Sequence, residues 1–219
     1  NRNFDARSGP ILFKPGGQNS ARKSLGLVEA PTLLFVGRIQ EFKGLDVAIE
    51  ALSLSANNDV RLVVVGGLSG NRGTETYLDI RRRIERCGLE ERILFVDPQP
   101  HQLLPTYYQA ADACLVPSRS ESFGLVALEA AACGLPVIAS NVGGLRDNVV
   151  DGVTGLLVNE RDPAEFAAAI DNLLEHQELR RLMGRRGVER ASLNSWDLGA
   201  SNAIDVFQRL ISRELVSCA

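Results

Sequence analysis

Six short apolar runs recur along the chain, and polar or turn-forming residues separate them. They cover residues 32–37, 60–67, 92–96, 113–117, 136–140 and 155–158. These runs show little alternation of apolar and polar positions, which is typical of strands that are buried on both faces of a parallel sheet. The pattern therefore predicts a parallel sheet in the core of the protein.

Amphipathic segments separate the apolar runs, and their apolar residues recur at intervals of three and four. Ile80, Ile84 and Cys87 follow the second run in this way. Asp162 before Pro163 is typical of a capped helix start, and another helix is expected over residues 178–191. This alternation of strand and helix predicts the α/β class, with a single Rossmann-like, doubly wound parallel sheet.

The two ends of the chain lack this alternation. Residues 1–30 are rich in Gly, Pro and Ser, which predicts a linker that enters a domain over residues 31–193. Residues 194–219 predict a C-terminal helix with an apolar stripe at positions 204, 207, 211 and 215, which must pack on something. The chain begins at Asn1 without a Met and has no signal-peptide pattern, so we expect a fragment or a processed chain.

Composition excludes several classes of function. The chain has 219 residues and a formal net charge of −3, which gives no support for nucleic-acid binding. No window approaches the length of apolar sequence that spans a membrane. The four cysteines are widely spaced, at positions 87, 114, 133 and 218, so we expect neither zinc nor a disulfide framework. We interpret them as thiols in a reducing cytoplasm.

Two segments at the ends of apolar runs offer anion-binding chemistry. After the first run, "VGRIQEFKG" places Arg38 and Lys43 in a loop bounded by glycines. Two cations at the carboxyl end of a buried strand suit a diphosphate, although this segment alone slightly favours a solvated loop with two ordinary basic residues. After the second run, "GGLSGNRG" lacks the GxGxxG spacing of dinucleotide sites and the ending of a P-loop, which argues against a nicotinamide-dependent oxidoreductase.

The segment "SESFGLVALEAAACG" carries the strongest signal. Ser122 is predicted to cap a helix whose first turn holds Gly124 and Leu125, and the free N–H groups of a helix start bind anions. Glu121 would then face a neutral polyol. Glu129 is expected about six residues inside the helix, roughly 9 Å along its axis. This layout suits a diphosphate between two sugars, whereas a helical Glu without such a partner usually points to solvent.

The segments "VGRIQEFKG" and "ESFGLVALE" resemble the donor-binding motifs of family 4 retaining glycosyltransferases of the GT-B architecture, and the second matches the E-x7-E signature of that family. The similarity extends from about Thr32 to the end of the chain. The "GGLSG" turn is most similar to the branch that contains sucrose-phosphate synthases and the N-acetylglucosaminyltransferase of mycothiol synthesis.

The resemblance implies a role for each motif residue. Arg38 and Lys43 would hold the diphosphate of a nucleotide sugar, Glu121 the hydroxyls of the donor sugar, and Glu129 those of the ribose. The turn from Val96 to Gln99 would meet the base. The implied reaction-centre residues are Arg38, Lys43 and Glu121, and the implied donor-binding residues are Gly37, Val96, Gln99, Ser122, Phe123, Gly124, Leu125, Val126 and Glu129.

The resemblance also implies what the chain lacks. The GT-B cleft lies between two Rossmann-like domains, and the sequence matches only the second. An N-terminal acceptor-binding domain is therefore expected in cis or in trans, and "ILFKPG" is interpreted as a remnant of the segment that joins the two. His101 does not occupy the catalytic-histidine position of the family, and Asp147 stands where many members have Glu.

The resemblance implies the transfer of a hexose with retention. Because the sequence has no DxD pair, the transfer is expected to be independent of a metal ion, and no separate cofactor is expected. The expected donor is UDP-glucose or UDP-N-acetylglucosamine, although GDP- and ADP-linked donors stay open. The alternative is a nucleotide-sugar-binding or regulatory module that transfers nothing by itself.

Overall fold

The computed structural model of the chain describes residues 12–68, 73–159, 161–193, 200–201 and 204–211. Its centre is a six-stranded sheet in which every pairing is parallel. The strands are β1 (Thr32–Val36), β2 (Arg61–Val65), β3 (Ile93–Val96), β4 (Ala113–Val116), β5 (Val137–Ser140) and β6 (Gly155–Val158). Each lies within one of the six predicted runs, so the predicted buried parallel sheet is confirmed.

The order of the strands across the sheet is β3-β2-β1-β4-β5-β6. This is the order of a doubly wound Rossmann-type sheet, in which the chain winds outward from the centre in both directions. The direction of winding reverses between β1 and β4, and ligands of such sheets bind at the carboxyl ends of the strands beside this point. The fold class predicted from the sequence is therefore confirmed.

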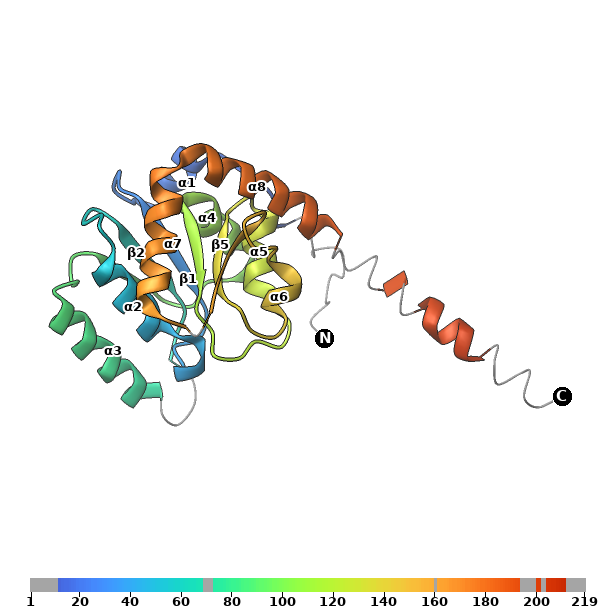
Figure 1. The fold of residues 1–219 in the computed structure, drawn as a ribbon, viewed down its shortest axis with the longest axis horizontal. Coiled ribbons are helices and arrows are strands. Elements are labelled where there is room, and N and C mark those ends of the chain that lie inside the picture. The colour runs from blue at the N-terminus through green and yellow to red at the C-terminus, as the bar shows by residue number, and fades with distance from the viewer. Residues whose placement is uncertain (1–11, 69–72, 160, 194–199, 202–203, 212–219) are drawn as a thin grey trace.

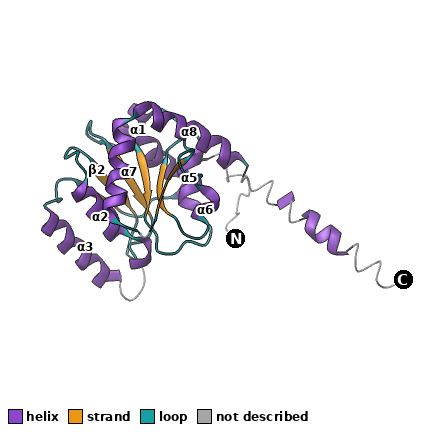
Figure 2. Ribbon diagram, in the orientation of Figure 1, coloured by secondary structure: helices purple, strands orange, loops and turns teal. Residues whose placement is uncertain are grey.

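Helices connect the strands and cover both faces of the sheet, as Figures 1 and 2 show. They are α1 (Gln18–Leu25), η1 (Glu41–Lys43), α2 (Leu45–Leu54), α3 (Gly73–Cys87), η2 (His101–Leu103), α4 (Leu104–Ala110), α5 (Leu125–Ala132), α6 (Leu145–Asn148), α7 (Pro163–Glu175) and α8 (Gln177–Ser192). The predicted start of α7 is confirmed, because the Asp162 side chain accepts a hydrogen bond from the Ala164 N–H at 2.9 Å.

Alternate residues of each strand enter two separate cores. On β1, Leu33 and Phe35 pack in the core that α2, α3 and α7 cover, while Leu34 packs in the core under α4 and α5. All three side chains are almost completely buried. This explains why the apolar runs in the sequence are continuous, because a strand with a core on each side has no position left for a polar residue.

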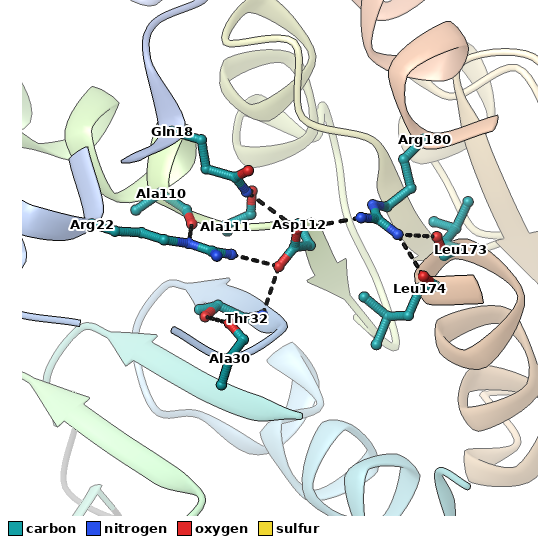
Figure 3. Close-up of polar contacts among 10 residues, drawn as sticks. All are labelled: Gln18, Arg22, Ala30, Thr32, Ala110, Ala111, Asp112, Leu173, Leu174 and Arg180. Carbon is teal, nitrogen blue, oxygen red and sulfur yellow. Dashed lines mark hydrogen bonds and ion pairs between the residues drawn. The ribbon is translucent and has the colours of Figure 1, made fainter. Parts of the chain in front are cut away.

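The segment before β1 differs from the predicted linker, because residues 18–25 form helix α1 and pack against α4. Asp112, just before β4, holds this helix in place (Figure 3). Its carboxylate accepts hydrogen bonds from Arg22 at 2.7 Å and from Gln18 at 3.2 Å, and Arg180 of α8 lies 3.7 Å away. These contacts join α1, the sheet and α8 at the amino-terminal edge of the sheet.

The described residues near the C-terminus are helical, as predicted, from 204 to 211. Figure 1 shows this helix apart from the sheet. Ile204, Phe207 and Ile211, which form the predicted apolar stripe, are 55%, 63% and 59% exposed. Position 215 of the stripe lies outside the described residues.

Candidate functional site

The carboxyl edge of the sheet brings Lys43 and Glu121 together from loops that are far apart in sequence. Lys43 is the last residue of η1, in the loop after β1, and Glu121 lies in the loop after β4. The Lys43 Nζ atom lies 2.7 Å from Oε2 of Glu121, and the two side chains are 22% and 17% exposed. The pair therefore marks the point between β1 and β4 where the winding of the sheet reverses.

The backbone joins the same two loops. The Arg119 N–H donates a hydrogen bond to the Phe42 carbonyl at 2.7 Å. Gly44 ends η1 in the left-handed conformation, with a φ of 77°, and a Cβ atom there would lie 2.0 Å from the Pro117 carbonyl oxygen. Only glycine fits such a conformation and such a close contact. The position of Lys43 is therefore fixed by the fold of two loops rather than by the basic residue itself.

Arg38 and Gly37 follow β1 directly. The Gly37 N–H donates to the Val65 carbonyl at 3.0 Å, which extends the pairing of β1 with β2 to the end of the strand. The Arg38 side chain is exposed at this edge. The first predicted diphosphate residue therefore lies at the same edge of the sheet as the Lys43–Glu121 pair.

Helix α5 begins later than the sequence predicted. Its N-cap is Gly124, in the left-handed conformation with a φ of 82°, and not Ser122, which is exposed in the preceding loop. The reason is a tertiary contact: the Asn148 side-chain amide donates to the Phe123 carbonyl, and the Gly144 N–H donates to the Glu121 carbonyl at 2.9 Å. These bonds hold residues 121–123 in a bent loop, so the first helical residue is Leu125.

The start of α5 has backbone N–H groups that suit an anion. Among the described residues, no group accepts a hydrogen bond from the backbone N–H of Leu125 or of Val126. Such N–H groups at a helix start carry a partial positive charge. The side chains of Phe123 and Leu125 are 55% and 52% exposed at the same place, while Val126 is partly buried.

Glu129 lies closer to the helix start than predicted. It is the fifth residue of α5, about 6 Å along the axis from Leu125 rather than 9 Å. Its side chain is only 19% exposed, so it does not point freely to solvent. Oε2 of its carboxylate accepts a hydrogen bond from the Tyr108 hydroxyl at 2.7 Å, and Oε1 lies 3.3 Å from Nε2 of His101.

The predicted base-binding turn leads into this contact. Val96 ends β3 and is partly buried, and the Gln99 side-chain amide donates to the Asp97 carbonyl at 2.9 Å, which closes the turn on itself. His101 follows two residues later and reaches Glu129. His101 therefore links the segment that follows the turn 96–99 to Glu129.

Sequence reasoning missed three residues that shape the site. Tyr108 and His101 contact Glu129, and Asn148 holds the loop before α5. Burial raises the pKa of the Tyr108 hydroxyl well above its ordinary value, and the Glu129 charge raises this pKa further. The pattern offered no signal for these roles, because Tyr108 has the spacing of a core residue and the other two lie in connecting segments.

Comparison with known proteins identifies the family. Residues 18–190 match the family described as glycosyl transferases group 1. The D-inositol 3-phosphate glycosyltransferase of Corynebacterium diphtheriae is 40% identical over 216 residues, which are 94% of this chain and 50% of that protein. That of Acidothermus cellulolyticus is 43% identical over 204 residues, which are 90% of this chain and 45% of that protein. The chain thus spans about half the length of the curated relatives it matches.

Solved structures share the fold and extend the similarity. Sucrose-phosphate synthase from Thermosynechococcus elongatus has a TM-score of 0.86 and 36% sequence identity, over 94% of this chain and 51% of that one. Anabaena HepE, solved in complex with UDP and glucose, has a TM-score of 0.82 and 25% identity, over 93% of this chain and 55% of that one. Because the family model covers residues 18–190 and the solved structures share the fold, the chain belongs to the group 1 glycosyltransferase family.

Proposed function

We propose that this chain is the donor-binding domain of a retaining glycosyltransferase that transfers a hexose from a UDP-sugar without a metal ion. The observation that carries the proposal is the contact between Lys43 and Glu121 at 2.7 Å, beside the start of α5. A cation, a carboxylate and free backbone N–H groups at one point suit a diphosphate with a sugar attached. In this arrangement Lys43 and Arg38 bind the diphosphate, and Glu121 accepts hydrogen bonds from the sugar.

The nucleoside would extend from the diphosphate toward Glu129. The Glu129 carboxylate suits vicinal ribose hydroxyls. The closed turn 96–99, which leads into His101 beside Glu129, offers backbone groups to a base. UDP is favoured as the nucleotide because Anabaena HepE was also solved in complex with UDP-glucose, at 26% identity and a TM-score of 0.82. UDP-glucose and UDP-N-acetylglucosamine are the donors proposed.

Arg38, Lys43 and the start of α5 would neutralise the charge of the leaving diphosphate, so that the reaction requires neither a metal ion nor a separate cofactor. Three cysteines of the described residues are free thiols, and two of them are buried. Free buried thiols suit a reducing compartment, and the cytoplasm is the location proposed. Within the described part of the chain, no helix combines the length and the apolar character needed to cross a membrane.

The acceptor would bind to a second domain. The exposed stripe of Ile204, Phe207 and Ile211 suits such a domain, because an exposed row of large apolar side chains marks an interaction surface. D-inositol 3-phosphate is the first acceptor to try, since the relatives at about 40% identity are named for it. We expect the present chain to bind the donor without transferring its sugar.

Calorimetric titration of the chain with UDP, GDP, ADP and NAD tests the proposal. Saturable binding of UDP in the presence of EDTA, and tighter binding of UDP-glucose or UDP-N-acetylglucosamine, is the expected result. Lys43→Ala should weaken the binding of UDP by roughly 1.5–3 kcal/mol, because it removes one charge-assisted contact to the diphosphate. The affinity for uridine, which has no diphosphate, should be unchanged. Equal losses for UDP and uridine, or binding of NAD in preference to UDP, would refute the proposed site.

A further inference from the structure

The Glu129 carboxylate is held on one side by a rigid donor. Tyr108 has no exposed surface, and its hydroxyl donates to Oε2 of Glu129 at 2.7 Å. The Tyr108 ring also packs edge-on against the buried Phe13 ring, with 5.8 Å between the ring centroids. Because a buried ring between packed neighbours has no other position, the hydroxyl fixes the direction of Oε2.

The other oxygen of the carboxylate has a different neighbour. His101 lies 3.3 Å from Oε1, but its side chain is 53% exposed. An exposed side chain is displaced at little cost, whereas a fully buried one is not. A ligand at this point would therefore meet a carboxylate whose orientation is set by Tyr108 and whose second oxygen becomes accessible when His101 moves aside.

The direction of the Tyr108 hydrogen bond is also fixed. Burial and the Glu129 charge raise the pKa of this hydroxyl well above its ordinary value, so it keeps its proton at neutral pH. An ionised carboxylate has only acceptor sites, and Tyr108 uses one of them. The remaining sites can accept hydrogen bonds from two hydroxyl groups on adjacent carbons.

We propose that Tyr108 is a positioning residue, which orients Glu129 toward the vicinal hydroxyls of a ribose and makes the site select ribonucleoside over deoxyribonucleoside diphosphates. This proposal rests on the proposed function, in which Glu129 binds the nucleoside. It goes further in naming the residue that sets the selectivity. A site built to accept a hydroxyl discriminates against the analogue that lacks it, because its own polar group is then left without a partner.

Tyr108→Phe tests the proposal, because it removes one oxygen atom and keeps the ring. The affinities of UDP, 2′-deoxy-UDP and pyrophosphate for the 219-residue chain are measured by calorimetry. The wild-type chain should bind UDP on the order of tenfold more tightly than 2′-deoxy-UDP. In Tyr108→Phe, UDP should bind about tenfold more weakly, while 2′-deoxy-UDP and pyrophosphate should be unchanged. Tyr107→Phe, which removes a hydroxyl from the preceding residue, is the matched control.

A double-mutant cycle separates positioning from general support of the fold. In the Glu129→Ala background, Tyr108→Phe should cause no further loss of UDP affinity, because the group that it orients is absent. A purely structural role would cause the same loss in both backgrounds, and that result would overturn the proposal. Melting temperatures are compared in parallel to confirm that each variant is folded.

The outcomes distinguish this proposal from the proposed function. Loss of UDP binding in Glu129→Ala together with wild-type affinity in Tyr108→Phe overturns only the role of Tyr108. Equal wild-type affinity for UDP and 2′-deoxy-UDP overturns it without any substitution. No binding of UDP, or unchanged UDP affinity in Glu129→Ala, contradicts instead the nucleotide site on which the proposal rests.

Discussion

Glu121→Gln should strengthen the binding of UDP, although it removes a residue of the proposed site. In the unliganded chain the Glu121 carboxylate lies 2.7 Å from the Lys43 ammonium group, and both side chains are mostly buried. A diphosphate must therefore compete with Glu121 for the Lys43 charge. Glutamine has the same shape without the charge, so the substitution leaves Lys43 available and removes a repulsion from the ligand.

The size of the effect follows from the exposure of the pair. Two unit charges about 4 Å apart attract by roughly 4 kcal/mol near a protein surface, but desolvation and ordering offset most of this. Exposed ion pairs contribute about 0–1 kcal/mol in total. Since the Lys43–Glu121 pair is less exposed than most, at 22% and 17%, we expect a gain at the upper end of that range. A gain of about 1 kcal/mol corresponds to roughly fivefold tighter binding of UDP.

The donor sugar should respond in the opposite direction. A hydrogen bond to a charged group contributes about 1.5–3 kcal/mol and one to a neutral group about 0.5–1.5 kcal/mol, so Glu121→Gln should weaken the contact with the sugar hydroxyls by about 1–1.5 kcal/mol. The advantage of UDP-glucose over UDP should therefore fall by roughly five- to tenfold in the variant. The opposite signs for UDP and for the attached sugar are the distinctive result.

Calorimetry at two ionic strengths, about 0.05 M and 0.5 M, provides the measurement, because the gain in UDP binding is electrostatic and should shrink with salt. Glu41→Gln is the matched control, since Glu41 lies in the same loop and is 74% exposed, 3.5 Å from Arg119. It should change UDP affinity by less than Glu121→Gln. Unchanged or weaker UDP binding in Glu121→Gln would refute the competition for Lys43.

Three further predictions concern the contacts that stabilise the fold. Asp112→Asn should lower the free energy of unfolding, measured by urea denaturation, by about 3 kcal/mol, because it leaves two mostly buried arginines without their carboxylate. The substitution should not change UDP binding, and an effect on binding would contradict the position of Asp112 at the opposite edge of the sheet from the proposed site. Gly44→Ala should lower the free energy of unfolding by about 2 kcal/mol and weaken the binding of UDP, because residue 44 has a φ of 77° and its Cβ atom would clash with the Pro117 carbonyl. A variant with unchanged stability and UDP affinity would contradict this close contact. Burial raises the pKa of Cys133 to about 12 and that of Cys114 higher still. As the pH rises, the two thiols therefore lose their protons in the unfolded chain before they do so in the folded chain. The free energy of unfolding should fall above about pH 8.5, by up to about 1.4 kcal/mol per pH unit for each thiol. Replacing both cysteines with Ala should remove this contribution to the slope, measured from urea midpoints at several pH values, and an unchanged slope would contradict the assignment.

The sheet was predictable because its signal is local. A strand with a core on each face needs an apolar residue at nearly every position, and Leu33, Leu34 and Phe35 on β1 show this directly. The start of α7 was predictable for a similar reason, since Asp162 caps a helix whose first residue is the adjacent Pro163. In both cases the structure depends on residues that are neighbours in the sequence.

Helix α1 and the start of α5 were not predictable, because each depends on a distant residue. Gln18 and Arg22 are helical in a segment rich in Gly and Pro, where Asp112, about ninety positions later, accepts hydrogen bonds from both. The loop before α5 is held by Asn148, 25 positions later, so the helix starts at Leu125 and not after Ser122. The shift of Glu129 toward the helix start follows from this contact.

The sequence indicated which residues lie near the carboxyl edge of the sheet, but not how they contact one another. The motif places Lys43, Glu121 and Glu129 in the chain, yet it contains no information on what each carboxylate contacts without a ligand. In the structure, Glu121 is paired with Lys43, and Glu129 with Tyr108. A spacing pattern shows which residues share an edge, whereas the partners depend on how loops from different strands pack.

Left-handed glycines occur at both edges of the sheet, and Gly26 and Gly134 are examples at the amino-terminal edge. At the carboxyl edge Gly44 and Gly124 are left-handed, and so is Arg161, the only residue other than glycine with a positive φ in the described part of the chain. The Arg161 guanidinium donates to the Pro117 carbonyl at 2.9 Å, beside Gly44. Such conformations cost about 1–3 kcal/mol each in residues other than glycine, and they persist only where neighbouring structure determines them. The opposite edge is held by the ion pairs of Asp112 with Arg22 and Arg180. A residue other than glycine that is held in such a conformation points to a functional site, so the position of Arg161, in the loop after β6, supports a ligand site at the carboxyl edge.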